Sequence, residues 1–568
     1  METSPGGIDR FRWIDENGNM ITAKSAKRRQ NKAERIARVG KLARGKFVSP
    51  GKVPEILRRI IEPGDILCLE GDNQKQADFL ANQLATLDKK DLRDIHLVMS
   101  CITLPAHIEL FRKGMIKQID FCYAGPQGGA VADLVKAKKF PVGAIHTYNE
   151  LYARYYIDLT PRVALIAAAQ ADRKGNLYLA ANTEDTPAIV EPTAFSDGIV
   201  FAQVNEIVDK LPRIDIPADQ VDFVVEAPYP MHLQALFTRD PAAITDVQVL
   251  MAMVALRGIY EKYEVQSLNH GVGFNTAAIE LLLPTYGERL GLKGKICKYW
   301  MVNPLPTMIP AIESGWVESV FAVGGEVGME RYTAARSDVF FTGRDGSFHS
   351  NRAMGQLAGH YAIDMFIGAS LQIDINGNSS TVSKNRITGF GGAPNMGCQP
   401  TGRRHPTKAW LKAGAEANPG PGSPPGRKLV VQMVETFQAG RVPTFVEELD
   451  ATDPSIRKAL HGVTPVMIYG DDVTHIVTEE GIANLAACRS VAERQAAIRA
   501  VAGYTPVGLK RKKRETEDLR ARGIVQLPED VGVRPSEASR SLLATQDIKG
   551  LVRWSQGLYD PPSQFVDW

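Results

Sequence analysis

The stretch QADRKGN at residues 170–176 shares the pattern Gln-x-Asp-x-x-Gly-Asn with QIDINGN at residues 372–378, and the two stretches start 202 residues apart. A second pair of segments, LEGDNQKQADFL around Gly71 and LNHGVGFNTAAIEL around Gly271, resemble each other at an offset of 200 residues. Two independent likenesses at nearly one spacing indicate a duplicated unit. Such a unit commonly places its chemistry between the copies, where loops from both converge.

A third pair of segments extends the duplication. IVFAQVNE from Ile199 matches LVVQMVET from Leu429 at an offset of 230 residues. The extra length falls across ANPGPGSPPG at residues 417–426, whose proline and glycine content predicts a loop inserted in the second copy.

Short apolar stretches that end at glycine alternate with segments of helical spacing along both copies. This order favours the α/β class, with mostly parallel sheets in two tandem domains. Four parts of the chain are therefore expected. They are a basic N-terminal segment at residues 1–50, a first domain at 51–228, a second domain at 229–500 with a helical joint at 229–263, and a C-terminal extension at 501–568.

The overall composition is that of an ordinary globular protein, with 44% hydrophobic and 23% charged residues among 568. A net charge of +3 gives no support to a general nucleic-acid role. Basic runs at residues 23–46 and 509–522 predict solvated helix faces or, alternatively, docking of an acidic partner. The N-terminus does not resemble a signal peptide and no apolar run reaches about 18 residues, so a cytoplasmic protein is expected.

The cysteines and histidines favour no metal site. The six cysteines lack CxxC spacing and no histidine pair lies nearby in metal-ligand register, so buried free thiols are expected.

Three glycine loops stand out, around Gly71, at Gly271–Gly273 and at Gly389–Gly397. None has the spacing of a phosphate-binding or dinucleotide-binding loop. Glycine after a strand lets the backbone approach a ligand, and amides at the following helix start favour developing negative charge. The loops therefore suit the oxyanion of a thioester reaction, although for each one alone a tight turn or a close helix–sheet contact is the simpler explanation.

Carboxamide side chains are dense around these loops. A carboxamide hydrogen-bonds a carboxylate or a thioester oxygen without changing its own charge, which suits group transfer more than proton transfer. For any single side chain, capping of a turn is the simpler explanation. The residues concerned are Asn73, Gln74, Gln76, Asn269, Asn275, Asn303 and Asn395.

With the duplicated strand–glycine–helix plan, these motifs resemble the coenzyme A transferase family. GGAPNMG at 391–397 and THIVTEEGIANL at 474–485 resemble, in looser form, its members related to acetyl-CoA hydrolases and to citrate lyase α subunits. The likeness is greatest to the α subunits of malonate decarboxylases and covers nearly the whole chain, including GAIHTYNELYAR, QSLNHGVGFNTAAIELLLPTYGE and TPVMIYGDDVTHIVTEEGIA.

The resemblance implies an acyl-exchange enzyme that acts on an acyl carrier protein. Acetyl on the carrier thiol would be replaced by malonyl from free malonate, with release of acetate. The chain itself would bind no cofactor and would use the coenzyme A-derived prosthetic group of the carrier. The implied partners are the carrier subunit and the decarboxylase β and γ subunits, with no nucleic acid and no membrane.

The residues expected at the site come from the glycine and carboxamide loops. Malonate is a dianion, so an arginine is also expected, with Arg344 and Arg239 as candidates. The expected catalytic residues are Asn303, Gly273, Asn275 and Gly392. The expected substrate or thioester contacts are Gly71, Asn73, Gln74, His270, Gly271, Phe274, Arg344, Gly391 and Asn395.

In one respect the sequence departs from the family. Many coenzyme A transferases form a thioester on a glutamate, and in hydrolase-like members that glutamate lies in a GIHTE-type loop. The corresponding stretch here is YWMVNPLPTMIPAIESG, where Asn303 is the polar residue of the loop and Glu313 lies at the later turn. Direct exchange through a mixed anhydride is therefore expected, unless Glu313, Glu326 or Glu330 takes the covalent role. His146 in GAIHTYNE belongs to the first copy and is expected to be structural or to line the substrate site.

Two alternatives remain from the sequence. One is an acyl-CoA hydrolase or a transferase that uses free coenzyme A, since the same oxyanion donors serve both. The other is a non-catalytic scaffold that only holds a carrier protein, for which the basic terminal segments would be suited.

Overall fold

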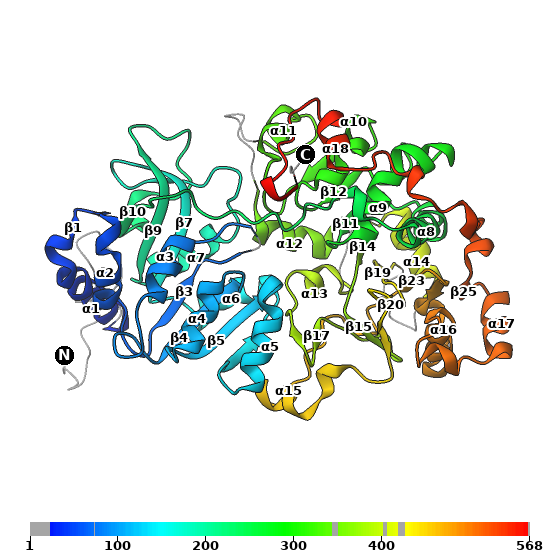
Figure 1. Ribbon diagram of the computed structural model, residues 1–568, viewed down its shortest axis with the longest axis horizontal. Coiled ribbons are helices and arrows are strands. Elements are labelled where there is room, and N and C mark those ends of the chain that lie inside the picture. Colours follow the sequence, from blue (N-terminus) through cyan, green and yellow to red (C-terminus); the bar gives the residue numbers. More distant parts are fainter. Residues whose placement is uncertain (1–22, 73, 343–349, 401–405, 418–425, 566–568) are drawn as a thin grey trace, which may run out of the picture.

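The computed structural model describes residues 23–72, 74–342, 350–400, 406–417 and 426–565. Two α/β halves lie side by side, the first in blue to teal and the second in green to red (Figure 1). Each half is built around one large and mostly parallel sheet.

The sheet of the first half has the strand order β1-β2-β10-β9-β7-β3-β4-β5-β6. All neighbours along this order pair in parallel except β1 with β2, and the short β8 pairs antiparallel with β7. The strands are β1 (Ala43–Arg44), β2 (Phe47–Val48), β3 (Ile66–Leu69), β4 (Ile95–Cys101), β5 (Ile116–Tyr123), β6 (Val142–Ile145), β7 (Val163–Asp172), β8 (Leu177–Tyr178), β9 (Ile199–Val208) and β10 (Phe223–Glu226).

The sheet of the second half has the order β13-β12-β11-β14-β19-β23-β24-β25. Pairing is parallel from β13 to β23 and antiparallel beyond. The strands are β11 (Ser267–His270), β12 (Tyr299–Met301), β13 (Ser319–Phe321), β14 (Met365–Gly368), β19 (Leu429–Met433), β23 (His475–Thr478), β24 (Gly481–Asn484) and β25 (Val525–Gln526).

The strand orders confirm the predicted duplication. The run β10-β9-β7-β3-β4-β5 of the first sheet corresponds to β23-β19-β14-β11-β12-β13 of the second. The segments around Gly71 and Gly271 follow β3 and β11, and the pair at Ile199 and Leu429 begins β9 and β19. These two sequence likenesses therefore fall on equivalent strands.

The repeated Gln-x-Asp-x-x-Gly-Asn pattern is a turn that the two halves share. Asp172 Oδ1 accepts hydrogen bonds from the amides of Lys174 and Asn176, at 2.9 and 3.0 Å, and Asn176 Nδ2 donates to Asp172 Oδ2. Asp374 and Asn378 make the same contacts in the second copy. Gly175 and Gly377 have φ of +91° and +86°, a region that glycine adopts without strain. The pattern is thus structural and repeats because the turn does.

Helices cover both sheets (Figure 1). Within the predicted joint at residues 229–263, the long helix is α8, which begins at Asp246 and continues as a π-helix over Leu256–Glu261. The helices of the first half are α1 (Ala23–Val39), α2 (Val53–Ile60), α3 (Asp78–Ala85), α4 (Pro105–Arg112), α5 (Gly128–Lys136), α6 (Tyr148–Ile157) and α7 (Thr186–Phe195). Those of the second half are α8 (Asp246–Ala255), α9 (Phe274–Leu282), α10 (Ile309–Glu313), α11 (Glu330–Ala335), α12 (Arg352–Tyr361), α13 (Ala393–Met396), α14 (Lys408–Glu416), α15 (Pro454–Ala459), α16 (Val491–Val501), α17 (Lys513–Ala521) and α18 (Ile548–Trp554).

Two stretches of the second half, one before and one after β19 in the chain, reach the first half. The first stretch carries the hairpin of β17 (Val382–Ser383) and β18 (Arg386–Ile387), and the second carries helix α15, and both contact α5. The residues that they add to the hydrophobic core of the first half are Val382, Ile387, Leu449, Ala451, Ile456 and Leu460. The remaining short strands are β15 (Gln372–Asp374), β16 (Ser379–Ser380), β20 (Phe437–Gln438), β21 (Val442–Pro443) and β22 (Phe445–Val446).

The first described segment of the chain packs on the first half, and the last described segment packs on the second half. Residues 43–48, expected in the N-terminal segment, join the first sheet through β10, and α1 is tied down by buried Arg35, which pairs with Glu62 and Asp65. Residues 525–526, expected in the C-terminal extension, join the second sheet. Short edge strands carry no periodic pattern, so the expected boundaries cut through both sheets.

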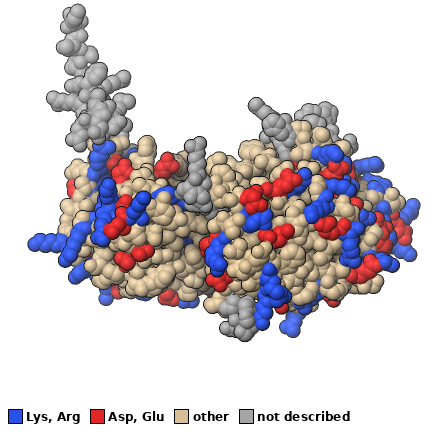
Figure 2. Space-filling view, turned by 90° about the horizontal axis from the view of Figure 1, so that it is seen from above, with Lys and Arg blue, Asp and Glu red and all other residues tan. Residues whose placement is uncertain are grey.

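The surface carries intermingled charges of both signs in Figure 2, in keeping with the small net charge. No helix in the described part of the chain is long and apolar enough to cross a membrane. All six cysteines are free; Cys68, Cys101, Cys122 and Cys297 are buried, whereas Cys398 and Cys488 are half-buried.

His146 is part of the core of the first half. Its Nε2 lies 2.7 Å from Asp120 Oδ1, and its Nδ1 lies 3.0 Å from Glu150 Oε1. Burial lowers the pKa of His146, but the hydrogen bonds to Asp120 and Glu150 outweigh it and raise the pKa from 6.5 to about 8. His96 also bonds Asp120, at 2.7 Å. Of the two roles expected for His146, the structure shows the structural one.

Replacing His146 by Gln should therefore destabilise the protein in a pH-dependent way. The pKa is raised on folding, so the stabilisation is complete below pH 6.5 and is lost as the pH rises to about 8. The rise of about 1.5 pKa units corresponds to about 2 kcal/mol. Urea unfolding of the wild type and His146→Gln should show a difference that shrinks by this amount between about pH 6 and about pH 9. The matched control is the same change at exposed His232.

Candidate active site

A cavity of about 300 Å³ lies where the two halves meet. It forms at the ends of β11 and β14, and carboxyl ends of parallel strands are the usual place for ligands in open α/β sheets. Five of the residues expected at the site line it, namely Asn303, His270, Gly271, Gly391 and Gly392. Its other polar or charged lining residues are Tyr123, Tyr148, Arg239, Asn269, Gln356, Thr381 and Thr388.

The glycine loop at residues 388–392 forms the wall of the cavity that joins the halves. It comes from the second half but pairs with the end of β5 in the first, since the Phe390 amide donates to Cys122 O and the Ala124 amide donates to Thr388 O, both at 2.7 Å. Gly389 has φ of +78°, and a Cβ there would stand 2.4 Å from Cys122 O. Only glycine allows this close approach.

The backbone amides of the cavity are not equally available. The Gly271 amide donates to Ile367 O at 2.7 Å and the Gly391 amide donates to Cys122 O at 3.0 Å. The Gly392 amide has no hydrogen-bond acceptor among the described residues. Of the three expected glycine donors that line the cavity, Gly392 is the one left for a ligand.

Asn303 is held by a buried network that joins the two copies. Its Nδ2 donates to Gln74 Oε1 and to Gly325 O, both at 3.0 Å. Gln74 belongs to the first glycine loop and does not line the cavity, while Asn303 follows β12 of the second half. The expected meeting of the two glycine loops is thus indirect and runs through these side chains.

Glu326 continues this network behind the cavity wall. Its Oε2 accepts from Gln74 Nε2 at 2.6 Å, and its Oε1 accepts from the Thr238 amide and hydroxyl at 2.8 and 2.7 Å. Burial raises the pKa of Glu326 to about 7. Glu326 is 1% exposed and does not line the cavity. It therefore holds Gln74 and the backbone next to Arg239 in place.

Arg239 is the only lysine or arginine among the described residues that line the cavity. Its Nη1 donates to the carbonyls of Leu236 and Thr238 at 2.9 and 2.8 Å, and the guanidinium lies 5.6 Å from the centre of the Phe274 ring. No carboxylate of the described chain lies within ion-pair distance of it. Burial lowers the pKa of this guanidinium. An arginine held in this way favours binding of an anion.

His270 lines the cavity but offers it no free ring nitrogen. Nε2 lies 2.7 Å from Tyr260 Oη, and Nδ1 lies 2.8 Å from Glu280 Oε1. The ring packs edge-on against Trp300. Its place in the sequence next to Gly271 predicted the position but not the direction of the side chain.

The other expected residues lie outside the cavity wall. Gly71 makes the close contact of its loop with Cys101, whose amide donates to Gly71 O at 2.6 Å. Gly273 precedes α9, Asn275 Nδ2 donates to Met433 O and Asn395 Nδ2 donates to Gln356 Oε1. Phe274 supports Arg239 from below. Asn73 and Arg344 lie outside the described residues.

The two other glutamates considered for a covalent role also lie away from the cavity. Glu313 Oε1 accepts from Tyr332 Oη at 2.7 Å and pairs with Arg336. Glu330 begins α11, and burial raises the pKa of its carboxyl. Neither residue lines the cavity.

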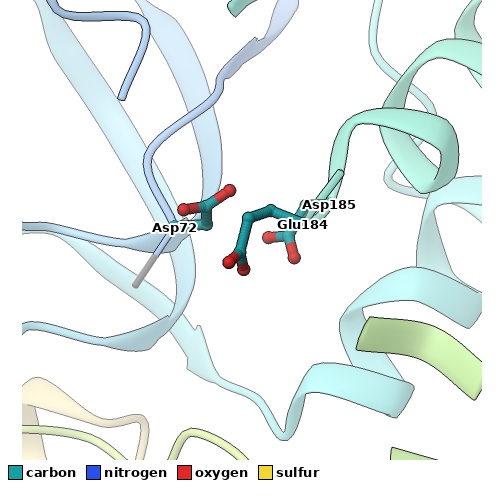
Figure 3. A group of neighbouring side chains, drawn as sticks. All are labelled: Asp72, Glu184 and Asp185. Carbon is teal, nitrogen blue, oxygen red and sulfur yellow. The ribbon is translucent and has the colours of Figure 1, made fainter. Parts of the chain in front are cut away.

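A second buried network, which the sequence did not reveal, lies beside the cavity. Asp72, Glu184 and Asp185 come from two loops of the first half, and their carboxylates gather in one place (Figure 3), with oxygens within 4.8 Å of one another. Arg352 at the start of α12 reaches in from the second half, pairs with Glu184 and lies 3.1 Å from Asp185. Burial, followed by repulsion from Asp72, raises the pKa of Asp185 well above its ordinary value.

The same arginine supports the cavity wall. Its guanidinium lies 5.0 Å from the centre of the ring of Tyr148, which lines the cavity. Tyr152, one turn further along α6, donates from its hydroxyl to Asp185 at 2.5 Å. Arg352 supplies the positive charge that these carboxylates require. Because it comes from the second half and also packs on Tyr148, the shape of the cavity depends on how the two halves pack together.

Two tandem parallel-sheet halves with a glycine-walled cavity between them form a coenzyme A transferase-like fold. An acyl-CoA transferase from Escherichia coli O157:H7 shares this fold, with a TM-score of 0.51, 15% identity and coverage of 76% of this chain and 87% of that one. A family model described as malonate decarboxylase, alpha subunit, transporter matches residues 24–568, and the chain belongs to this family.

Two individual relatives are much more similar. An acetyl-S-ACP:malonate ACP transferase from Malonomonas rubra is 58% identical over 517 residues, which cover 90% of this chain and 93% of that protein. A chain in the crystal structure of a Pseudomonas malonate decarboxylase hetero-tetramer in complex with malonate has a TM-score of 0.93 and 57% identity, covering 96% of this chain and 100% of that one.

Replacing Arg352 by Met should destabilise the protein strongly, because it leaves buried carboxylates without their cation. Loss of one partner of a buried ion pair costs about 3–5 kcal/mol. The matched control is Arg173→Met, which removes an exposed pair with Asp209 and should leave the stability nearly unchanged. Urea unfolding followed by tryptophan fluorescence measures both. Equal effects of the two changes would show that the Arg352 cluster is not a major contact between the halves.

Proposed function

We propose that this chain exchanges acyl groups on an acyl carrier protein, converting the acetyl thioester and malonate into the malonyl thioester and acetate. The observation that carries the proposal is the chemistry of the cavity. It combines one arginine, a fixed carboxamide and a glycine amide without an acceptor, and none of its described lining residues is a carboxylate. The name of the Malonomonas rubra relative supports the same substrates.

The reaction has two acyl-transfer steps. A malonate carboxylate oxygen attacks the acetyl thioester carbonyl, the C–S bond breaks, and a mixed acetyl-malonyl anhydride and a carrier thiolate form. The thiolate then attacks the malonyl carbonyl of the anhydride, the C–O bond breaks, and acetate leaves. Each step passes through an oxyanion, which fixed hydrogen-bond donors stabilise.

The residues of the cavity have distinct roles in this scheme. Arg239 binds a malonate carboxylate, since a guanidinium can hold it with two parallel hydrogen bonds. The Gly392 amide donates to the oxyanion. Asn303 lies at the same wall and shapes it, since both hydrogens of its Nδ2 are held by Gln74 and Gly325. Gln74 and Glu326 act only through Asn303 and the Thr238 backbone.

The same lining supports exchange without a covalent enzyme intermediate. A glutamyl thioester requires a carboxylate in contact with the thioester, and Glu326 is enclosed behind Gln74 and Thr238. Hydrolysis requires a base for water, and both ring nitrogens of His270 are engaged. These features disfavour the acyl-CoA hydrolase.

The reacting thiol belongs to the coenzyme A-derived group of the carrier, so the chain itself requires no bound cofactor. The carrier subunit and the decarboxylase β and γ subunits are the proposed partners. A hetero-tetramer is the assembly of the similar Pseudomonas protein.

The direct test is single-turnover exchange. The purified chain is mixed with acetyl-loaded carrier and isotopically labelled malonate, and the label on the carrier is followed by intact mass. Labelled carrier with stoichiometric acetate, and an unchanged mass of the chain throughout, are expected. Acetate without labelled carrier would indicate a hydrolase, and no reaction with loaded carrier would favour the scaffold.

Arg239→Met should weaken malonate binding. Loss of a charged hydrogen-bonded pair costs about 1.5–3 kcal/mol, which corresponds to a KM for malonate raised roughly ten- to hundredfold. The matched control is Arg289→Met, since Arg289 also lies over an aromatic ring, Tyr286 at 5.7 Å, but away from the cavity. An unchanged KM in Arg239→Met would exclude this arginine from malonate recognition.

A further inference from the structure

Malonate and acetate present the same reacting group to the cavity. Each has a carboxylate oxygen that can attack a thioester carbonyl, and malonate differs by its second carboxylate. A site distinguishes two ligands through contacts that only one of them makes. Because acetate is the product of the exchange, a preference for malonate requires protein groups that hold the carboxylate that does not react.

Tyr123 and Gln356 line the cavity with neutral hydrogen-bond donors that have no acceptor among the described residues. Gln356 lies beside the oxyanion donor, since a Cβ on Gly392 would stand 2.5 Å from Gln356 Nε2. Its Oε1 accepts from Asn395 Nδ2 at 3.2 Å, which fixes the orientation of the carboxamide. Gln356 therefore belongs to the end of the cavity at which the Gly392 amide lies.

Tyr123 is the donor that lies near the guanidinium of Arg239. Burial raises the pKa of Tyr123, and the charges of Arg386 and Arg239 act against this rise. The hydroxyl therefore stays protonated at neutral pH and can donate to an anion. Of these two arginines, Arg239 lines the cavity together with Tyr123. A ligand in the cavity thus meets one cation and one neutral donor from neighbouring side chains.

The backbone around Tyr123 holds its ring in place. Tyr123 ends β5, and its carbonyl accepts from the Ile102 amide at 2.8 Å. Gly125 follows with φ of +41°, and a Cβ there would stand 2.9 Å from Tyr123 Cε1. The chain turns closely past the ring at a residue without a side chain. The hydroxyl is therefore positioned before a ligand arrives, which lowers the cost of binding.

We propose that Arg239 and Tyr123 together hold the carboxylate of malonate that does not react, and that this pair makes the site prefer malonate over acetate. The inference rests on the proposed function and names the groups that select its substrate. The guanidinium supplies the charge and the Tyr123 hydroxyl adds a hydrogen bond to the same carboxylate. The other carboxylate then lies toward Gly392, where it attacks the thioester carbonyl. Acetate fills only this second position and leaves Tyr123 without its anionic acceptor.

The test compares the two acids with the full chain. Acetyl-loaded carrier is mixed with isotopically labelled malonate or labelled acetate, and the label on the carrier is followed by intact mass. With acetate, an oxygen of the labelled acid attacks the thioester and the C–S bond breaks. The carrier thiolate then attacks the labelled carbonyl of the anhydride, and unlabelled acetate leaves. This exchange uses the same chemistry without a second carboxylate.

Tyr123→Phe removes the hydroxyl and keeps the ring. It should lower kcat/KM for malonate about tenfold or more and leave kcat/KM for acetate unchanged. Arg239→Met should reduce the same preference for malonate, whereas Gln356→Leu should lower kcat/KM for both acids by similar factors. The matched control is Tyr156→Phe, which removes the hydroxyl of an exposed tyrosine outside the cavity, bonded to Glu191, and should change neither value. Circular dichroism checks the folding of each variant.

The outcomes separate this inference from the proposed function. Equal losses for both acids in Tyr123→Phe would overturn the inference, because a hydroxyl that only supports the cavity wall affects both acids alike. A wild type that exchanges neither acid would refute the proposed function. Calorimetry of malonate and acetate binding to the chain without carrier then decides on the inference. A preference for malonate that Tyr123→Phe loses would support it, and no preference in the wild type, or one kept in the variant, would overturn it.

Discussion

The insertion of Arg352 among the carboxylates of the first half is the interaction on which the active-site region depends. An arginine that is 1% exposed loses its hydration, and the loss is compensated only if both halves are closed around Glu184 and Asp185. Closure places α12 against α6, stacks the guanidinium over Tyr148 and brings the glycine loop at residues 388–392 to the end of β5. The walls of the cavity come from both halves, so its shape depends on all of these contacts.

The duplicated fold could be predicted because its signals are local. The Gln-x-Asp-x-x-Gly-Asn turn needs an aspartate, a glycine and an asparagine at fixed spacing, so the same sequence pattern appears wherever the chain forms this turn. The position of Asn303 and Gly392 at the cavity could be predicted for a related reason, since polar residues and glycines that follow buried strands collect at one edge of a sheet.

The rest of the site depends on contacts between residues far apart in the chain. Arg352 and Glu184 are 168 residues apart and neither stands in a recognisable pattern. Adjacent residues can also face different ways. The ring of His270 bonds Glu280 inside the second half, whereas the next residue, Gly271, forms part of the cavity wall. Strand edges such as β1 and β25 are too short to show alternation, which is why the expected boundaries fell inside the sheets.

The parts of the second half that reach the first have a consequence for the independence of the two copies. Ile387, Leu449 and Ile456 complete the hydrophobic core of the first half, although they belong to the second copy. The two copies therefore have equivalent sheets but unequal roles in packing. The interior of the first copy is complete only when residues of the second copy pack into it, so this copy cannot be cut out of the chain at the repeat boundary with its core intact.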